Sequence, residues 1–467
     1  MKSRIYLVTW LLLLTTTNPV HAQSLSLRQF KDAVQSNDPG YKSAQLAAKG
    51  SQQLSSEADS LTGVQFEARA VQKDDKRATI VPAFQGERTK YKSYLLGLKQ
   101  QTPWGLQWSL SQNYANTQID FPASTTPART TEFNDSYPKL ELSLSLWRNF
   151  LGAETSAQID QTEQLSLARQ KQAEIQYIQK DMDIETAYYS VLALQQALEA
   201  QKDSVSRSEK VLEWTKGRIS RNLADNSDIY QAQAAVTSRK IDLLTSQTNL
   251  NKAIEKFNSL RGIQSNQLKE KLVDSEISIE KLKLSKKENK VRKDLRLSQF
   301  NTASNQASYL ASKEKHKPQL DLSFSALKQS RDVVSDNTQY RNKDDVQVAL
   351  TFTVPINQIK ESRFRDGYNN LALSQKLSEQ SRLQDELLTW NSNVDQAQQL
   401  HDQVFAAREL EGLQKNKANA EREKFNRGRS TLFQVLSYEQ DYLAARSQRI
   451  NLELQVRQFI SQLNLFE

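Results

Sequence analysis

The sequence predicts a mainly α-helical chain with membrane β-strands, built as a strand and long-helix unit that occurs twice. Long stretches without proline repeat apolar residues at helical spacing, and short stretches alternate apolar with small or polar residues. A motif also returns 206 residues later. Its first copy is Lys216 to Asn222 followed by Asp228-Ile229-Tyr230, and its second is Lys424 to Gly428 followed by Gln434-Val435-Leu436. Such duplication is typical of a symmetric, elongated architecture.

Each copy of the motif precedes a helix in which the residues at every seventh position are mostly apolar. An apolar seam kept at this spacing predicts a coiled-coil neighbour for each helix. The seam positions are Ile229, Val236, Leu243, Leu250 and Phe257 after the first copy, and Val435, Tyr442, Arg449, Val456 and Leu463 after the second.

Residues 1–22 have the pattern of a secretory signal peptide. Lys2 and Arg4 form a basic head, a short apolar run follows, and Val20-His21-Ala22 offers a cleavage site. No later segment has the run of about eighteen apolar residues that a transmembrane helix needs. The chain has no cysteine, so neither a lipoprotein anchor nor a disulfide is expected.

The net charge is +9, from 63 basic and 54 acidic residues. The basic residues are scattered along helical stretches, whereas a nucleic-acid site needs them clustered beside stacking aromatic residues. We therefore expect no nucleic-acid partner.

The first repeat is predicted over residues 23–262. It begins with a helical region that is interrupted at Asp38-Pro39-Gly40. Strands are expected over about 64–147, where Val64 to Ala70 and Leu140 to Leu146 alternate cleanly. Long helices follow over about 153–262, with a break at Asn222 to Ser227 where Ser227 could cap the next helix.

Two stretches between these strands are less regular. Residues 91–114 form a looser hairpin candidate around the turn Thr102 to Gly105, and residues 119–137 have the composition of an exposed loop. The hairpin candidate could lengthen a barrel, form a cap or raise the strand count, and the sequence leaves these options open.

The second repeat is predicted over residues 291–467, after a charged linker at 263–290. Its strands are expected over about 319–354, with a polar loop from Ser330 to Asp345, and its long helices over about 361–465. The prediction is thus two clear strands per half. Four strands cannot close a barrel and open edges are not tolerated in lipid, so the chain is expected to oligomerise.

Together these patterns resemble the TolC family of trimeric outer-membrane channels. The resemblance covers roughly residues 25–467 and rests on the duplicated tip motif, which ends its first helix at Leu260-Arg261-Gly262. It also rests on Arg292-Lys293-Asp294-Leu295, Lys317-Pro318-Gln319-Leu320 and Val354-Pro355-Ile356. The order, spacing and duplication of these short patterns are what is specific.

The resemblance implies a homotrimer with a twelve-stranded β-barrel in outer-membrane lipid and an α-helical barrel that crosses the periplasm. It implies helix tips that dock a periplasmic adaptor (membrane fusion) protein of an inner-membrane pump. The candidate docking residues are Arg221, Asn222, Leu223, Arg427, Gly428 and Arg429. The alternative is a plain helical hairpin turn with basic residues that aid solubility.

The matching positions also suggest a periplasmic constriction. Its candidates are Asp225, Asp228, Gln434 and Ser437. Three copies of Asp228 at a narrow mouth would attract cations. The alternative is that Asp228 only stabilises the first turn of its helix.

Trp104, Trp108 and Trp147 lie in the strand region and are candidates for an aromatic girdle at the membrane interface, or for ordinary hairpin packing. His316 and His401 lack the paired spacing of a zinc site, and no nucleophile triad or phosphate loop is present. We therefore expect no metal, no cofactor and no enzymatic activity.

The function expected from the sequence is a passive exit duct of a tripartite efflux pump or a type I secretion system. Efflux of drugs and secretion of proteins are not distinguished. The alternative from another class is a secreted coiled-coil scaffold or adhesin, which has no need for duplicated alternating strands.

Overall fold

The computed structural model describes residues 24–122, 130–222, 224–274, 279–288, 290–334, 338–354 and 358–466. The expected signal peptide, residues 1–22, lies outside the described residues. The chain divides into two compact units. The helical unit lies within Met1–Ala44, Tyr177–Asn289 and Asn391–Leu465, and the sheet unit lies within Gln45–Gln176, Lys290–Trp390 and Phe466–Glu467.

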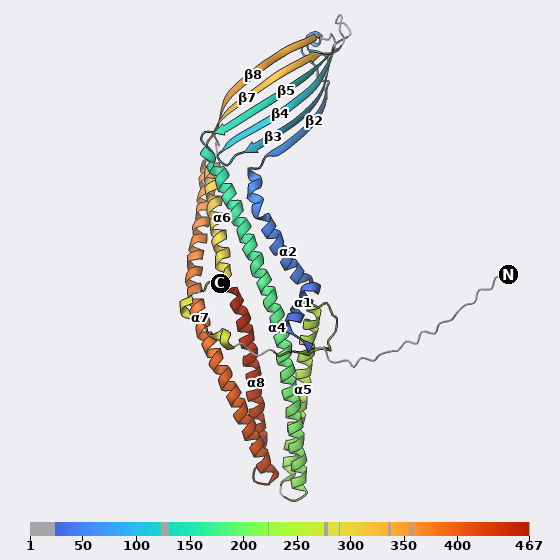
Figure 1. Cartoon of the computed structure of the whole chain (residues 1–467), viewed down its shortest axis with the longest axis vertical. Coiled ribbons are helices and arrows are strands. Elements are labelled where there is room, and N and C mark those ends of the chain that lie inside the picture. Colours follow the sequence, from blue (N-terminus) through green and yellow to red (C-terminus); the bar gives the residue numbers. More distant parts are fainter. Residues whose placement is uncertain are drawn as a thin grey trace, which may run out of the picture. The chain divides into compact units, whose positions relative to one another are not determined.

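The sheet unit contains one antiparallel sheet of six strands. The strands are β2 (Gln65–Asp75), β3 (Arg88–Gln101), β4 (Leu106–Asp120), β5 (Thr130–Ser145), β7 (Gln319–Val333) and β8 (Thr338–Thr353). They are hydrogen-bonded in the order β2-β3-β4-β5-β7-β8, as Figure 1 shows. Pairing of β5 with β7 therefore joins the two halves of the sequence in one sheet.

The expectation of two strands in the first half is wrong, because this half supplies four. The hairpin candidate at 91–114 forms β3 and β4, which lie between β2 and β5 in the sheet. Its weaker alternation has a visible cause at Leu95. This leucine lies on the polar face of the sheet, opposite Arg69 of β2 and Asn113 of β4, and so interrupts the pattern of period two.

The strands also extend into both stretches that were expected to be loops. β4 continues to Asp120 and β5 begins at Thr130, while β7 continues to Val333 and β8 begins at Thr338. These extensions are mostly polar, so only a weak hydrophobic alternation marks them. Threonine nevertheless favours extended backbone, and it recurs in this part of the chain.

Long helices make up most of the rest of the chain. Two of them, α4 and α7, contain no proline and continue from one unit into the other. None of the helices in the described parts of the chain is both long and apolar enough to cross a membrane. The long helices are α4 (Ala153–Ile219), α5 (Asn226–Leu260), α6 (Lys293–Lys315), α7 (Gln358–Asn426) and α8 (Leu432–Gln462).

The N-terminal helices are separated where Asp38-Pro39-Gly40 predicts a break. Ser26 and Gln29 form a capping box at the first of them, and Pro39 begins the second. These helices are α1 (Leu27–Asn37) and α2 (Pro39–Gln53), followed by the 3₁₀ helix η1 (Leu54–Leu61). The remaining short elements are β1 (Ser24–Leu25), α3 (Pro82–Gln85), η2 (Phe150–Gly152), β6 (Lys271–Leu272), η3 (Ile279–Leu282), η4 (Lys286–Glu288) and η5 (Leu463–Leu465).

The largest core cluster of the helical unit brings α1, α4 and α5 together. Phe30 of α1 stacks on Phe257 of α5 with ring centroids 4.0 Å apart, and both side chains are fully buried. Tyr188 of α4 packs beside them, and its hydroxyl lies 2.8 Å from the carbonyl oxygen of Leu25 in β1. Burial raises the pKa of Tyr188 to about 12, so this hydroxyl stays protonated at neutral pH.

We predict that Phe257→Ala lowers the free energy of unfolding by about 3–5 kcal/mol, because it removes a buried aromatic ring and leaves a cavity. The exposed Leu244 on the same helix provides a matched control, and Leu244→Ala should change stability by no more than about 0.5 kcal/mol. Denaturant unfolding followed by circular dichroism measures both. Equal effects of the two substitutions would contradict the assigned core.

Candidate functional site

The turn between α4 and α5 forms the first of two helical hairpin tips. Asn222 adopts a left-handed conformation with φ of 56°, which asparagine tolerates better than most residues. The N-cap of α5 is Asp225, so the expectation that Ser227 caps this helix is wrong. Asp225 and Asp228 form a reciprocal capping box, in which the Asp225 backbone amide donates to Asp228 at 3.4 Å. Asp228 thus has a local role at the helix start.

The turn between α7 and α8 forms the second tip. Gly428 has φ of 77°, and the amides of Gly428 and Arg429 donate to the carbonyls of Phe425 and Lys424, at 2.9 and 2.8 Å. This is the Schellman pattern of a helix end. Thr431 then caps α8 by accepting a hydrogen bond from the Gln434 amide at 3.3 Å. Gln434 is exposed, and Ser437 is half-buried one turn further on.

Arg218 joins the two tips. Its guanidinium group donates to the carbonyl oxygen of Ser430 at 3.0 Å and lies 4.5 Å from the centre of the Phe425 ring. Below it, a small apolar cluster contains residues from both hairpins. Its buried members are Val211, Ala232, Phe425, Leu432 and Val435. Arg218 belongs to the first copy of the tip motif, but only the structure shows that it bridges the hairpins.

A buried carboxylate lies between the hairpins further along the helices. Glu439 of α8 is only 6% exposed, and its carboxylate lies 2.8 Å from the Arg422 guanidinium and 3.9 Å from that of Arg207. Arg207 also stacks over the Tyr442 ring at 4.8 Å. Burial raises the pKa of Glu439, although both arginines oppose this effect. These charges connect α4, α7 and α8.

Arg449, the charged residue among the seam positions of α8, also has ion-pair partners. Arg449 is half-buried and donates to Glu453 at 2.8 Å, and it also pairs with Glu411 of α7. The structure therefore pairs this arginine with two glutamates, one on its own helix and one on α7. Charged contacts replace an apolar seam residue at this position of α8.

The candidate docking residues lie at the ends of the hairpins and are accessible. Arg221, Asn222, Arg427, Gly428 and Arg429 are all exposed, whereas Leu223 lies outside the described residues. Two further exposed side chains lie near the tips, Tyr230 at 71% and Phe433 at 70%, and they were not among the docking candidates expected from the sequence. An aromatic residue at a helix start, outside the buried seam, is the signal that could have identified them.

The sheet has one apolar face and one polar face. A continuous apolar row crosses all six strands through directly paired residues, and a polar row lies beside it on the opposite face. Most side chains of the apolar row are exposed, as expected for a surface that requires lipid or another protein. The apolar row is Phe66, Leu98, Leu110, Leu140, Ala326 and Val346, and the polar row is Gln65, Lys99, Ser109, Glu141, Ser325 and Gln347.

The three candidate girdle tryptophans all lie near the sheet end where β3 turns into β4 and β5 leads into α4. Trp104 is exposed in the turn between β3 and β4, and Trp147 is exposed just after β5, where it stacks near Phe352. Trp108, near the start of β4, donates its indole N–H to Gln100 at 3.0 Å. The structure thus brings these tryptophans to one end of the sheet.

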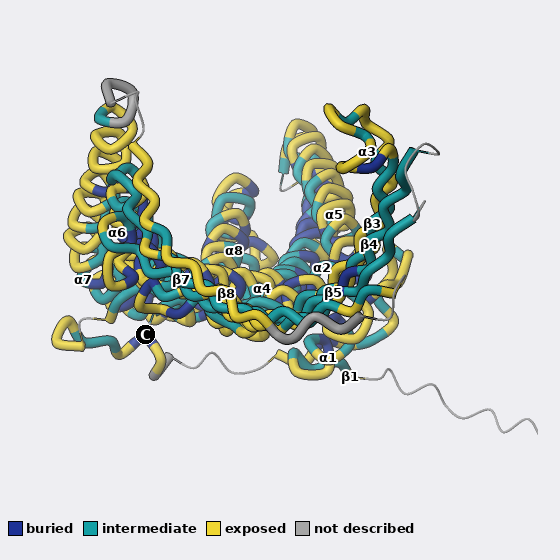
Figure 2. Tube along the Cα trace, turned by 90° about the horizontal axis from the view of Figure 1, so that it is seen from above, coloured by how far each residue is buried: buried dark blue, intermediate teal, exposed yellow. Residues whose placement is uncertain are grey.

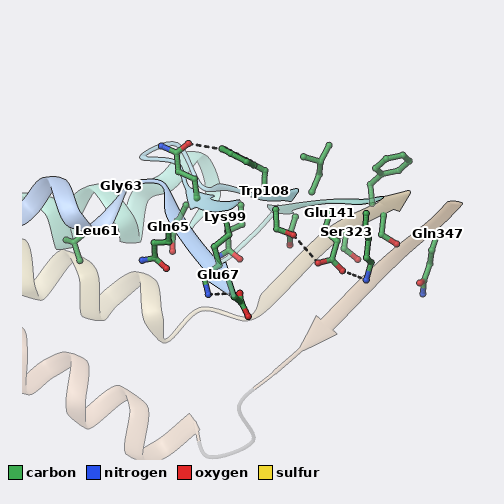
Figure 3. Close-up of a pocket in the computed structure, with 18 residues that line it drawn as sticks. Leu61, Gly63, Gln65, Glu67, Lys99, Trp108, Glu141, Ser323 and Gln347 are labelled. Carbon is green, nitrogen blue, oxygen red and sulfur yellow. Dashed lines mark hydrogen bonds and ion pairs between the residues drawn. The ribbon is translucent and has the colours of Figure 1, made fainter. Parts of the chain in front are cut away.

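A hollow of about 590 Å³ lies over the polar face at this end. Figure 3 shows Glu67, Lys99 and Glu141 along it, with Trp108 on the other side of the strands. Glu67 pairs with Lys99 at 3.2 Å, and Ser109 donates to Glu141 at 3.1 Å. The lining is hydrophilic and its charges are paired, which suits a surface in contact with water.

Two glycines lock the turn between β3 and β4 against the start of α4. Gly105 and Gly152 have φ of 87° and 78°, and a Cβ on Gly152 would lie 1.8 Å from the carbonyl oxygen of Pro103. Gln101 reinforces the contact by donating to the Thr155 hydroxyl at 2.7 Å. The turn is therefore fixed to the framework of the sheet unit.

In the part of the chain that the structure describes, no group of three or more His, Cys, Asp or Glu side chains could hold a metal ion. His401 lies 2.9 Å from its neighbour Asp402 and forms an isolated pair.

No protein-family model matches the sequence, and no curated protein matches it significantly. Solved structures do match. The outer membrane protein VceC from Vibrio cholerae has a TM-score of 0.64 and 13% identity, covering 94% of this chain and 95% of its own. The Neisseria gonorrhoeae MtrE outer membrane channel, in its open state, has a TM-score of 0.62 and 14% identity, covering 94% of this chain and 88% of its own.

The Campylobacter jejuni CmeC outer membrane channel gives a TM-score of 0.59 and 15% identity, covering 94% of this chain and 85% of its own. At such low identity the likeness establishes the fold. The chain therefore has the fold of TolC-like outer-membrane channels.

We predict that Glu439→Gln changes the pH dependence of stability. Because burial raises the pKa of this carboxyl, its contribution to stability is full below the pKa of an unfolded glutamate, about 4.3, and is lost as pH rises through the folded pKa. Arg422, Arg207, Arg239 and Asp203 are the charged groups that modulate it.

The unfolding free energy of the wild type should accordingly fall more steeply than that of Glu439→Gln as pH rises above about 4.3. Denaturant unfolding across pH measures the difference. The exposed Glu409 on α7 supplies the control, since Glu409→Gln should leave the wild-type profile unchanged. Parallel profiles for wild type and Glu439→Gln would refute the buried-carboxylate assignment.

We predict that Gly152→Ala disrupts the sheet unit, because the new Cβ would collide with the Pro103 carbonyl and the left-handed backbone disfavours alanine. Gly217→Ala in α4 is the control. Nothing lies within 4 Å of its added Cβ, and alanine favours a helix by about 1 kcal/mol. Thermal unfolding and protease resistance should separate the two variants; similar behaviour would argue against the locked turn.

Proposed function

We propose that the protein is the outer-membrane exit duct of a tripartite efflux pump or a type I secretion system. The observation that carries this proposal is the pair of adjacent rows on opposite faces of the sheet, one apolar and one polar. A barrel wall has this arrangement, with lipid outside and water inside. The shared fold with outer-membrane channels supports the same conclusion.

The duct is a homotrimer. Within the described sheet, β2 and β8 have no outer neighbour, and Figure 2 shows β8 largely exposed. Unpaired backbone groups are not tolerated in lipid, so the sheet needs further copies to close. The resemblance of the sequence to trimeric channels supports three copies, which would form a β-barrel in the outer membrane and an α-helical barrel in the periplasm.

The duplicated strand and long-helix repeat is part of this proposal. Asn222 and Gly428 occupy equivalent places in the two copies of the tip motif, and both adopt left-handed conformations. Residues 1–22 would direct export, and residues 263–290 would link the repeats. In this arrangement both hairpins of each chain contribute to one ring of helices.

The tips are the proposed site for a periplasmic adaptor protein and its inner-membrane pump. Arg221, Arg427 and Arg429 give an exposed basic surface, and Asn222, Leu223 and Gly428 complete the two turns. The exposed rings of Tyr230 and Phe433 would add apolar area, which suits a surface that excludes water on contact.

The periplasmic constriction is proposed at Asp225, Asp228, Gln434 and Ser437. Three copies of each aspartate would concentrate negative charge and favour cations. The capping role of Asp228 is compatible with this, because the box uses one carboxylate oxygen. The duct itself is passive and performs no chemistry, so its partners must supply the energy.

The alternative is a secreted coiled-coil scaffold or adhesin without channel activity. The exposed apolar row of the sheet disfavours it, because a soluble scaffold would bury such a surface. Fractionation separates the two functions, since a scaffold is soluble without detergent and a duct requires it.

We predict discrete single-channel openings when the detergent-purified protein is placed in a planar bilayer, and a weaker cation preference for Asp228→Asn. Asp242→Asn on the same helix, where the side chain is 45% exposed, is the control and should leave selectivity unchanged. Reversal potentials in asymmetric salt measure the preference.

Openings that Asp228→Asn does not alter would restrict Asp228 to its capping role. No insertion and no openings from a folded oligomer would contradict the duct and favour the scaffold.

A further inference from the structure

We infer that this duct closes as an eighteen-stranded barrel, in which β8 of each copy pairs with β2 of the next. Three copies of a six-stranded sheet give eighteen strands, whereas four strands per copy would give twelve. The inference rests on the proposed trimer and adds the identity of the seam and the width of the pore.

The hairpin of β3 and β4 continues the pattern of apolar and polar faces that a barrel wall requires. Leu98 and Leu110 continue the apolar row, while Lys99 and Ser109 continue the polar row. A hairpin that folded over the sheet as a cap would have no reason to keep this phase with strands on both sides.

The hydrogen-bonded ladders around the hairpin are also long and regular. β3 pairs with β2 from Lys99 to Thr89, and β4 pairs with β5 along its whole length, from Leu106 to Asp120. Gly97 permits close contact inside the hairpin, because a Cβ there would lie 2.9 Å from that of Ser111. Removing the hairpin would leave β2 and β5 without the strands that they pair with in this sheet.

The base of the hairpin is fixed to the chain that follows β5. Gly105 and Gly152 approach so closely that neither accepts a Cβ, and Ser156 of α4 donates to the Pro103 carbonyl at 3.3 Å. The hairpin is thus held at the position in the sheet where β4 meets β5.

The two free edges are suited to each other. Every neighbouring pair in the sheet is antiparallel and the number of strands is even, so β2 and β8 run in opposite directions. The β8 strand of one copy can therefore pair antiparallel with β2 of the next without a change of direction. A ring of such copies satisfies both edges and leaves no unpaired strand in lipid.

The strand number sets the width of the barrel. With strands about 4.8 Å apart and tilted by about 40°, eighteen strands give a backbone diameter of about 36 Å, against about 24 Å for twelve. The cross-section therefore roughly doubles. The lumen of such a barrel would admit an α-helix of about 10–12 Å diameter. We therefore expect size selection to take place at the helix tips.

The absence of cysteine from the sequence makes the seam directly testable by paired cysteines. Gln65→Cys in β2 is combined in turn with Gln347→Cys, Ala349→Cys or Thr351→Cys in β8, all on the polar face. Under oxidation of the full-length oligomer in detergent, at least one combination should give a covalent ladder that ends at the trimer.

Two further pairs make the result decisive. Ser323→Cys with Ala349→Cys joins paired residues of one chain and should form a disulfide without any covalent oligomer. Gln65→Cys with Ser143→Cys should not form one, because two strands separate β2 from β5 by about 14 Å.

Several outcomes would overturn the inference. A disulfide between Gln65→Cys and Ser143→Cys within one chain would mean that the hairpin leaves the barrel. A seam ladder that ends at the dimer would mean twelve strands from two copies, and no seam disulfide beside a positive control would mean that the edges do not meet. Bilayer conductance of the same preparations keeps the two proposals apart: a conducting protein with a failed seam refutes only the strand number, and a non-conducting one refutes the duct as well.

Discussion

The backbone hydrogen bonds at the edges of the sheet are the constraint on which the other features depend. Six strands satisfy one another internally, yet β2 and β8 each retain a row of amide and carbonyl groups without a described partner. Water can satisfy such groups but lipid cannot. In the proposed duct, the apolar row that runs from Phe66 to Val346 faces lipid. This duct therefore requires both a membrane and further copies of the sheet.

The helical unit meets a different requirement, because its hairpins must be held together where they end. Apolar packing there is limited to the cluster around Val211. Arg218 and the charges around Glu439 supply the remaining connections. Charged contacts are directional and sensitive to pH and ionic strength, whereas an apolar seam is neither. The ends of the hairpins are thus joined by charged contacts as well as by apolar packing.

The sequence predicted which main segments form strands and which form long helices, because hydrophobic periodicity distinguishes the two. It also identified the tip turns, where Asn222 and Gly428 are suited to left-handed backbone. It missed the strand status of β3 and β4, since Leu95 on the polar face weakens the alternation. It missed strand extensions such as the one at Thr130, because a mostly polar strand leaves little hydrophobic signal. Arg218 could not be assigned its bridging role, since its partners Phe425 and Ser430 are distant in sequence.

The hairpin of β3 and β4 bears on how the proposed channel could change its width. A single added strand would make both edges of the sheet run the same way, and antiparallel closure would fail. Strands can therefore be gained only as hairpins, and symmetry multiplies each gain by the number of copies. Pore calibre in such assemblies would change by large, discrete increments and not by gradual adjustment. A lineage that needed a slightly wider passage would have to alter the side chains lining it, or else accept a whole new hairpin with the glycines that anchor it, as at Gly105 and Gly152.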